Sequence, residues 1–258
     1  MRIKKVLVIG DSCEDVFQYG VCERLSPEAP VPIFNPTMKN SNHGMAGNVY
    51  MNLLSLGIEA DLISNTGITK TRIVDEVSNQ ILVRIDENDG VDEIRSDFLE
   101  GLDFTIYDAI IISDYNKGFI SQANIQYIST KHNMVFLDTK KKLGKWVDNI
   151  DFIKINEIEY KNNTQYLDLF YRNNLIVTLG GRGAYLRNKS IKKEFPIEKS
   201  HSVRDLSGAG DTFLAGLVAE FIKSNDISKA IIFANKCASW AVSQKGVVIV
   251  DLKGVSDD

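Results

Sequence analysis

Short apolar runs recur along the chain and alternate with segments of helical periodicity. The apolar runs have the length and character of strands buried on both faces of a sheet, and they lie at residues 6–9, 109–112, 135–137, 152–155 and 175–179. The helical patterns lie at residues 48–56, 122–132, 212–223 and 228–244. This alternation predicts an α/β fold with an open, mainly parallel sheet that is flanked by helices.

Two segments do not follow the alternation. Residues 16–34 carry three prolines between short apolar stretches, and residues 72–86 alternate like a half-exposed pair of strands. Together they predict a small β-strand lid beside the main sheet, within a single domain that spans residues 1–258. A further apolar run at residues 247–250 resembles a strand.

The composition excludes several classes of partner. The net charge is −4 and no basic block stands out, which argues against nucleic acid as a partner. No stretch approaches the roughly 20 apolar residues of a membrane span, and the first apolar run is too short for a signal peptide. The three cysteines, Cys13, Cys22 and Cys237, form no CxxC pair, so we expect a reducing, cytoplasmic location without a zinc site or a disulfide framework.

The stretch RDLSGAGDTFLAGL at residues 204–217 carries the clearest chemistry. Gly208, Ala209 and Gly210 precede Asp211 at the point where an apolar helix begins. The free backbone N–H groups of a helix N-terminus, approached closely through glycines, can hold a phosphate. A carboxylate beside them can accept the proton of a hydroxyl that attacks a γ-phosphate. Alternatively Asp211 only caps the helix, and the motif alone does not decide between the two.

Further motifs give the sequence a family resemblance. DLSGAGDTFLAG resembles the DTxGAGD signature of the ribokinase-like (PfkB) carbohydrate kinases, and VIGDSCEDVFQYG, NHGMAGNVYMNLLSLG, IISDYNKG, LDTKK, INEIE and VTLGGRGAYL resemble further blocks in the family's order. The resemblance covers nearly the whole chain. It implies a ribokinase-like fold, ATP and Mg²⁺, Asp211 as the base, and the backbone amides of Gly208, Ala209 and Gly210 as the groups that stabilise the transferring phosphoryl group.

One branch of the family is closer than the others. ERLSPEAPVPIF and KTRIVDEVSNQILVRID resemble segments of the D-glycero-D-manno-heptose-7-phosphate kinases, which form the kinase half of bifunctional ADP-heptose synthases. This branch implies a heptose 7-phosphate acceptor that is phosphorylated on its anomeric hydroxyl. A kinase for another sugar stays open.

The resemblance also assigns residues to the acceptor. It implies sugar binding by Asp11, Asp15, Gly44 and Asn48. Without the resemblance, Asp11 is also typical of a turn and Asn48 of a helix N-cap. Cationic side chains are candidates for the phosphate of the substrate, and each reads equally well as a solvated surface charge; they are Arg24, Lys70 and Arg72.

A third group of residues is assigned to the nucleotide. The loop with Thr178, Gly180 and Gly183 resembles the one that follows the nucleotide, and Asn235 matches a position on the adenine side. Asn156 and Glu159 resemble the NxxE block, in which the acid orders Mg²⁺ through water. The plain alternatives are a glycine hairpin turn, a polar residue on a helix surface and a capping asparagine.

The sequence departs from the family pattern in two places. Met45 stands where the family often has a second glycine, and only residues 67–70 remain where the kinases usually carry a helix and a strand. These departures keep open a nucleotide- or sugar-binding homologue with weakened or no turnover. Because an exposed sheet needs cover, we expect a homodimer through the lid.

Two other enzyme classes fit less well. Residues 10–12 (GDS) resemble the nucleophile block of GDS esterases, but no histidine has an aspartate three residues before it, which that mechanism requires. The first strand is followed by GDSCED rather than GxGxxG, which argues against a Rossmann dehydrogenase.

Overall fold

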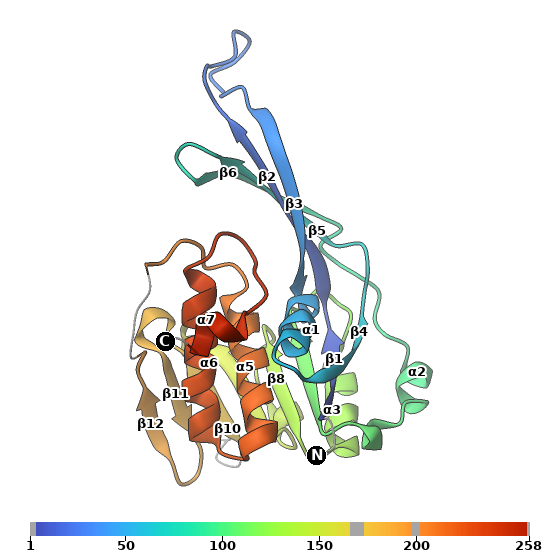
Figure 1. Ribbon diagram of the computed structural model, residues 1–258. Coiled ribbons are helices and arrows are strands. Elements are labelled where there is room, and N and C mark those ends of the chain that lie inside the picture. Colours follow the sequence, from blue (N-terminus) through green and yellow to red (C-terminus); the bar gives the residue numbers. More distant parts are fainter. Residues whose placement is uncertain (1–3, 166–172, 198–201, 257–258) are drawn as a thin grey trace.

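The larger of two sheets has eight strands and forms the body of the molecule (Figure 1). The structure is a computed structural model and describes residues 4–165, 173–197 and 202–256. In spatial order the strands are β12 (Lys192–Phe195), β11 (Ala184–Arg187), β10 (Asn174–Thr178), β9 (Phe152–Asn156), β8 (Val135–Thr139), β7 (Ala109–Asp114), β1 (Lys5–Gly10) and β4 (Glu59–Ser64). All neighbours from β10 to β4 pair in parallel, and β11 and β12 add an antiparallel edge.

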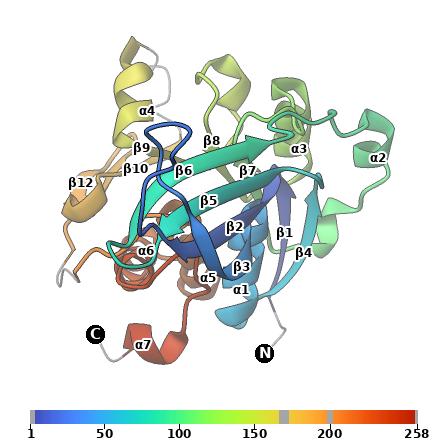
Figure 2. The same ribbon diagram turned by 90° about the horizontal axis from the view of Figure 1, so that it is seen from above.

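Helices cover both faces of this sheet (Figure 2). One face carries α1 (Ala46–Ser55), α5 (Ala209–Ser224) and α6 (Ile227–Val242), with α7 (Leu252–Ser256) packed on α6. The other face carries α2 (Ser96–Glu100), α3 (Gln122–Lys131), α4 (Glu157–Asn162) and the short 3₁₀ turns at Phe104–Ile106 and Lys145–Val147. A third 3₁₀ turn, Gly180–Arg182, links β10 to β11.

The core follows from the period of two in each strand. In β7, Ala109 and Ile111 face the layer of α1, α5 and α6, whereas Ile110 and Ile112 face the layer of α3. The interior strands are therefore apolar at most positions on both faces, which explains the short apolar runs in the sequence. The mainly parallel α/β sheet that these runs predict is confirmed.

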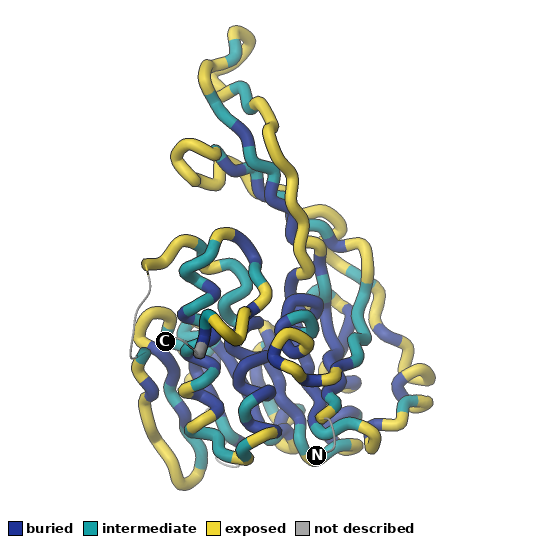
Figure 3. The backbone as a smooth tube through the Cα atoms, viewed as in Figure 1, coloured by how far each residue is buried: buried dark blue, intermediate teal, exposed yellow. Residues whose placement is uncertain are grey.

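The second sheet stands out from the body as a lid (Figure 1). Its spatial order is β3 (Asn35–Met45), β2 (Ser12–Val21), β5 (Thr69–Asp75) and β6 (Gln80–Glu87). β2 begins two residues after β1 ends, and β3 runs directly into α1, so the lid grows out of the edge of the main sheet. The outer strands β3 and β6 are almost entirely exposed, whereas the inner strands β2 and β5 are mostly buried or half-buried (Figure 3).

The strands of the lid differ from the segments at 16–34 and 72–86 that the sequence indicates. β2 starts earlier, residues 22–34 form the connecting loop, and β3 is an additional strand. Every residue of β3 from Asn35 to His43 is exposed, so its sequence, NPTMKNSNH, shows no apolar alternation that would predict a strand.

The apolar run at residues 247–250 is not a strand, contrary to the expectation from sequence. Its polar backbone groups bond to α1 instead: the Val250 N–H donates to Oδ1 of Asn52 at 2.8 Å, and the Ser55 hydroxyl donates to the Val250 carbonyl at 2.5 Å. Val247 and Val250 are buried by this arrangement. Within the described residues, no helix has the length and apolar character needed to cross a membrane.

Candidate active site

The glycine turn and the start of α5 are the centre of the candidate site. Gly208 occupies the N-cap position with φ of +77°, in the left-handed region that favours glycine. A Cβ there would also lie 2.7 Å from Nδ2 of Asn48, so no other residue fits without rearrangement. No side chain caps the helix. The Ala209 N–H donates to the Leu206 carbonyl at 3.4 Å, whereas the N–H groups of Gly210 and Asp211 have no hydrogen-bond partner among the described residues and are available to an anion.

The Asp211 side chain does not cap its helix, although the sequence left that alternative open. It lies in the first turn of α5 and is only 3% exposed. Its Oδ1 accepts a 2.6 Å hydrogen bond from the Tyr115 hydroxyl, and its Oδ2 accepts a 3.2 Å bond from Nδ2 of Asn48. Asn48 is itself fixed by Asn52, whose Nδ2 donates to Oδ1 of Asn48 at 2.8 Å. Three separate parts of the fold therefore converge on this carboxylate.

The surroundings of Asp211 tune its proton affinity. Burial raises the pKa of its carboxyl to about 6, and the negative charge of Asp138 acts in the same direction. The hydrogen bonds from Tyr115 and Asn48 and the positive charge of Lys154 act against this rise of the pKa. A carboxylate with a pKa near 6 is ionised at neutral pH and takes up a proton more readily than an ordinary aspartate, as a general base requires.

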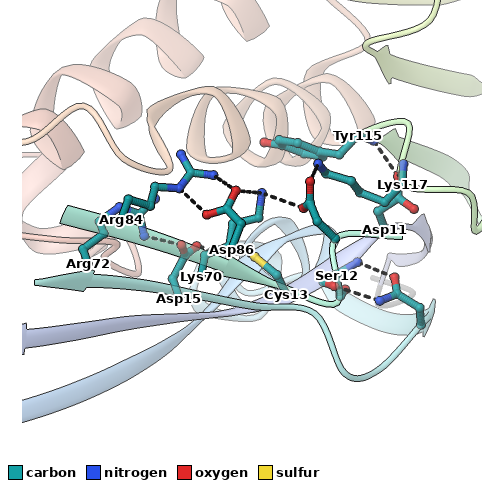
Figure 4. A network of polar contacts seen from close by, with 12 residues as sticks. Asp11, Ser12, Cys13, Asp15, Lys70, Arg72, Arg84, Asp86, Tyr115 and Lys117 are labelled. Carbon is teal, nitrogen blue, oxygen red and sulfur yellow. Dashed lines mark hydrogen bonds and ion pairs between the residues drawn. The ribbon is translucent and has the colours of Figure 1, made fainter. Parts of the chain in front are cut away.

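Asp11 follows β1 and holds the loop that carries Tyr115 (Figure 4). Its carboxylate accepts hydrogen bonds from the backbone N–H groups of Tyr115, Lys117 and Phe119 at 2.8, 3.1 and 3.3 Å, and its side chain is fully buried. Burial raises the pKa of Asp11, and these N–H groups partly offset the rise. Asp11 thus positions the Tyr115 hydroxyl against Asp211, and a direct contact of Asp11 with a sugar stays a prediction.

Charged side chains line the face of the lid that meets the body (Figure 4). Asp15 of β2 forms a buried ion pair with Arg72 of β5. Lys70 is also buried, and its Nζ lies 4.0 Å from Asp86 and 3.7 Å from Asp89. Two more cations join this group: Arg84 pairs with Asp86 at 2.7 Å, and Lys117 pairs with Asp89.

Gly44 and Met45 connect the lid to α1. A Cβ on Gly44 would collide with Oδ2 of Asp15 and with Sγ of Cys13, so any other residue would force these side chains to move. Met45 has φ of +58°, a conformation that non-glycine residues rarely adopt, and its side chain is buried in a small cluster with Cys13, Ile68 and Tyr115. The side chain that the sequence marks as unusual thus packs beside the tyrosine that binds Asp211.

A mostly apolar pocket of about 180 Å³ lies on the other side of the glycine turn. It brings together Thr178, Gly180 and Gly183 from the loop after β10 with Asn235 from α6 and Ala209 and Gly210 from α5. Nδ2 of Asn235 donates to the Phe195 carbonyl at 2.9 Å. The loop is also a hairpin turn, since β10 and β11 pair antiparallel. Four of the residues that the sequence assigns to a nucleotide, Thr178, Gly180, Gly183 and Asn235, therefore share one cavity with the start of α5, whereas Asn156 does not line it.

Asn156 and Glu159 form a reciprocal cap at the start of α4. The Glu159 N–H donates to Oδ1 of Asn156 at 2.9 Å, and Oε2 of Glu159 accepts from the Asn156 N–H at 2.7 Å. Oε1 of Glu159 accepts from Nδ2 of Asn156 at 2.8 Å and also pairs with Lys140. Because both carboxylate oxygens are engaged, Glu159 fits a hydrated cation that it contacts through water better than a directly bound one.

Arg24 is not brought to this site. It lies exposed in the loop between β2 and β3, at the end of the lid that points away from the body (Figures 1 and 3). Asp138, Lys154 and Arg84 also lie close to the site among the described residues, although no motif in the sequence marks them. The lysine could have been noticed as the one charged residue inside the run FIKI, which reads as a buried strand.

Comparison with known proteins identifies the family. The description "pfkB family carbohydrate kinase" belongs to the family model that matches residues 97–252. The chain belongs to the pfkB family of carbohydrate kinases. Solved structures of the same fold include a ribokinase of Thermotoga maritima (TM-score 0.74, 18% identity, 99% of each chain) and a nucleoside kinase of Methanocaldococcus jannaschii (TM-score 0.73, 17% identity, 98% and 97% of the two chains).

Curated pfkB relatives include bifunctional proteins named HldE. The protein from Helicobacter pylori is 31% identical over 311 aligned positions, which cover 98% of this chain and 66% of that protein. The protein from Nitratiruptor sp. is 29% identical and is covered to 64% of its length. This chain therefore spans just under two thirds of those relatives, and the 311 positions exceed its 258 residues because the relatives hold segments that it lacks.

Proposed function

We propose that this pfkB-family chain is an ATP-dependent kinase of a sugar phosphate, with D-glycero-D-manno-heptose 7-phosphate as the acceptor and its anomeric hydroxyl as the position phosphorylated. One observation carries the proposal: the Asp211 carboxylate is buried beside a glycine turn whose helix has no side-chain cap, and it accepts a hydrogen bond from Asn48 of α1 at 3.2 Å. A base and an anion site in such proximity are what phosphoryl transfer to a hydroxyl requires.

Each group of residues has a separate role in the proposed reaction. Asp211 accepts the proton of the acceptor hydroxyl as its oxygen attacks the γ-phosphate of ATP, and ADP leaves. The amides of Gly208, Ala209 and Gly210 stabilise the negative charge of the transferring group. Mg²⁺, when bound, neutralises charge on the nucleotide phosphates; Glu159 is suited to orient its water ligands, with Asn156 holding that carboxylate in place.

The phosphate on the acceptor is supported by the cations of the lid. Lys70 is buried, and its nearest carboxylates are 3.7 and 4.0 Å away, so its ammonium group is only loosely paired. Arg72 is buried against Asp15 and lies on the same face of β5, two residues further along. A phosphate bound there would complete the pairing of these cations. The resemblance of residues 23–34 and 70–86 to the heptose-7-phosphate kinases makes this heptose the sugar to test first.

The test is ADP release measured with a panel of sugars and sugar phosphates. We expect turnover with heptose 7-phosphate to exceed that with unphosphorylated sugars, and Asp211→Asn to lose about 10³-fold or more in kcat. Asp226→Asn, at the N-cap of α6, is the matched control and should keep the kcat of the wild type. Equal turnover of Asp211→Asn and wild type would refute the mechanism, and preference for another sugar would refute the acceptor.

A nucleotide-binding homologue without turnover is the second candidate. The strained backbone of Met45, beside Tyr115, is the observation that favours it. In that case the protein would bind ATP, but it would release no ADP with any acceptor in the panel.

A further inference from the structure

A buried ion pair lies beneath the glycine turn and has no part in the mechanism above. Nζ of Lys154 on β9 binds Oδ2 of Asp138 on β8 at 2.6 Å, and the two residues are 4% and 2% exposed. They are direct partners in the parallel register of the two strands. Both project from the face that α5 covers, because the preceding residues on that face, Phe136 and Phe152, contact Phe221 of α5.

The register explains why this pair is unusual. Two residues earlier, on the same face, the two strands pair Phe136 with Phe152, whose rings stack with their centroids 4.3 Å apart. That face of the sheet thus accommodates large apolar side chains. Removing two charges from water is costly, and a buried pair adds little stability over an apolar replacement. The presence of a lysine and an aspartate at this position therefore indicates that their charges serve the function of the protein rather than its stability.

The ammonium group lies next to the turn that holds the anion. A Cβ on Gly210 would be 3.1 Å from Nζ of Lys154, so the glycine leaves room for the charge. Gly210 also lines the pocket assigned to the nucleotide. Asp138 accepts from Lys154 through Oδ2, while its Oδ1 is buried without a hydrogen-bond partner among the described residues. Asp138 thus anchors Lys154 and makes no other bond there.

We propose that Lys154 is a further charge-stabilising residue of the phosphoryl-transfer site, held by Asp138 beneath the glycine turn, where its positive charge attracts the phosphates of the nucleotide and the transferring phosphoryl group. This inference rests on the proposed kinase function. It adds to the backbone N–H groups a full positive charge that is screened from water and pre-positioned, as electrostatic stabilisation requires. The same pair acts on Asp211, because Lys154 lowers and Asp138 raises the pKa of its carboxyl.

The test separates charge from packing. Lys154→Met removes the charge, Lys154→Arg keeps it, and the double variant Lys154→Met with Asp138→Leu replaces the pair by apolar side chains that preserve folding. We expect kcat to fall about 10²-fold in Lys154→Met and in the double variant, with the KM for the sugar unchanged and partial recovery in Lys154→Arg. Wild-type kcat in the double variant would show that the pair only supports the fold and would overturn the proposal.

A binding measurement keeps the inference testable without turnover. In calorimetry with Mg²⁺, the double variant should bind ATP about tenfold more weakly than the wild type and bind adenosine equally well. If the wild type phosphorylates no acceptor, the kinase proposal fails while this comparison still decides the role of Lys154. Equal loss of affinity for ATP and adenosine, or no loss for either, would overturn the inference even if the wild type is an active kinase.

Discussion

The hydroxyl of Tyr115 donates a 2.6 Å hydrogen bond to Oδ1 of Asp211, which lies 96 residues further along the chain. Burial, followed by the nearby charge of Asp211, raises the pKa of Tyr115 well above its ordinary value, so the phenol keeps its proton and remains a donor. A donor to the ionised form lowers the pKa of the carboxyl that receives it. Tyr115 therefore helps to keep Asp211 ionised in spite of its burial.

Replacing Tyr115 should change how activity depends on pH. In the wild type we expect kcat to fall as the pH drops through about 6, because protonated Asp211 cannot accept a proton. Tyr115→Phe removes the hydrogen bond, which raises the pKa of Asp211 and moves this fall to higher pH by about one unit. The control is Tyr107→Phe, whose hydroxyl donates to Asp61 at 2.8 Å outside the site. An unchanged profile in Tyr115→Phe would contradict the role of this bond.

The ionised Asp211 carboxylate should also lower the free energy of unfolding at neutral pH. Its pKa is about 6 in the folded chain against 3.8 for an ordinary aspartate, so the folded state binds the proton more tightly than the unfolded chain. Its contribution to the free energy of unfolding is therefore present below pH 4 and is lost as the pH rises toward 6 and beyond. We expect Asp211→Asn to be more stable than the wild type by about 2 to 3 kcal/mol at pH 7.5, with a smaller difference at pH 4.5. Urea unfolding at both pH values measures this, and a variant that is less stable at pH 7.5 would contradict it.

The sequence predicted the body of the fold because each interior strand there must be apolar on both faces. β7 and β8 are visible as AIII and VFL for this reason. β3 was not predicted, because its exposed residues are free to be polar and leave no period of two. The final run VVIV was misread as a strand, since its valines fill the core while its backbone bonds to side chains of α1.

The sequence predicted some residues of the candidate site and missed others, because only some of them belong to a local motif. Short motifs mark residues whose backbone or chemistry is special, such as Gly208 and Asp211, and the structure brings these together with Asn48. A pair formed across strands, such as Asp138 with Lys154, leaves no local pattern because its members are 16 residues apart. Arg24 illustrates the reverse: its charge is plain in the sequence, but its place at the outer end of the lid depends on strand lengths that the sequence did not reveal.

Replacing Lys70 tests whether the enzyme recognises a phosphate group on its acceptor. Lys70→Met keeps the length of the buried side chain and removes the charge, so the KM for a phosphorylated acceptor should rise about 10- to 100-fold. Turnover of an unphosphorylated sugar should change little. Lys39→Met, on the exposed strand β3, is the matched control. An equal change of KM for phosphorylated and unphosphorylated acceptors would show that Lys70 does not bind the phosphate of the acceptor.

Met45→Gly tests whether the departure from the family pattern limits the enzyme. Glycine adopts the positive φ of this position without strain, which otherwise costs about 1 to 3 kcal/mol. It also removes a buried side chain from the cluster with Cys13, Ile68 and Tyr115. We expect the thermal midpoint to change little because these effects oppose each other, while the larger acceptor pocket changes the relative kcat/KM of different sugars. The same order of sugars in both proteins would show that Met45 does not shape the pocket.

The outer face of the lid should join two copies of the chain. Val83 and Ile85 of β6 pair with Ile73 and Thr71, on the face opposite Arg72, and are 51% and 46% exposed. Exposed apolar side chains on an edge strand are normally covered, and a second lid offers the same apolar face. We expect the wild type to sediment as a dimer and Val83→Asp with Ile85→Asp to sediment as a monomer. Ile158→Asp, at a more exposed apolar position on α4, should leave the dimer intact. A wild type that stays monomeric at micromolar concentration, or a double variant that stays dimeric, would contradict this arrangement.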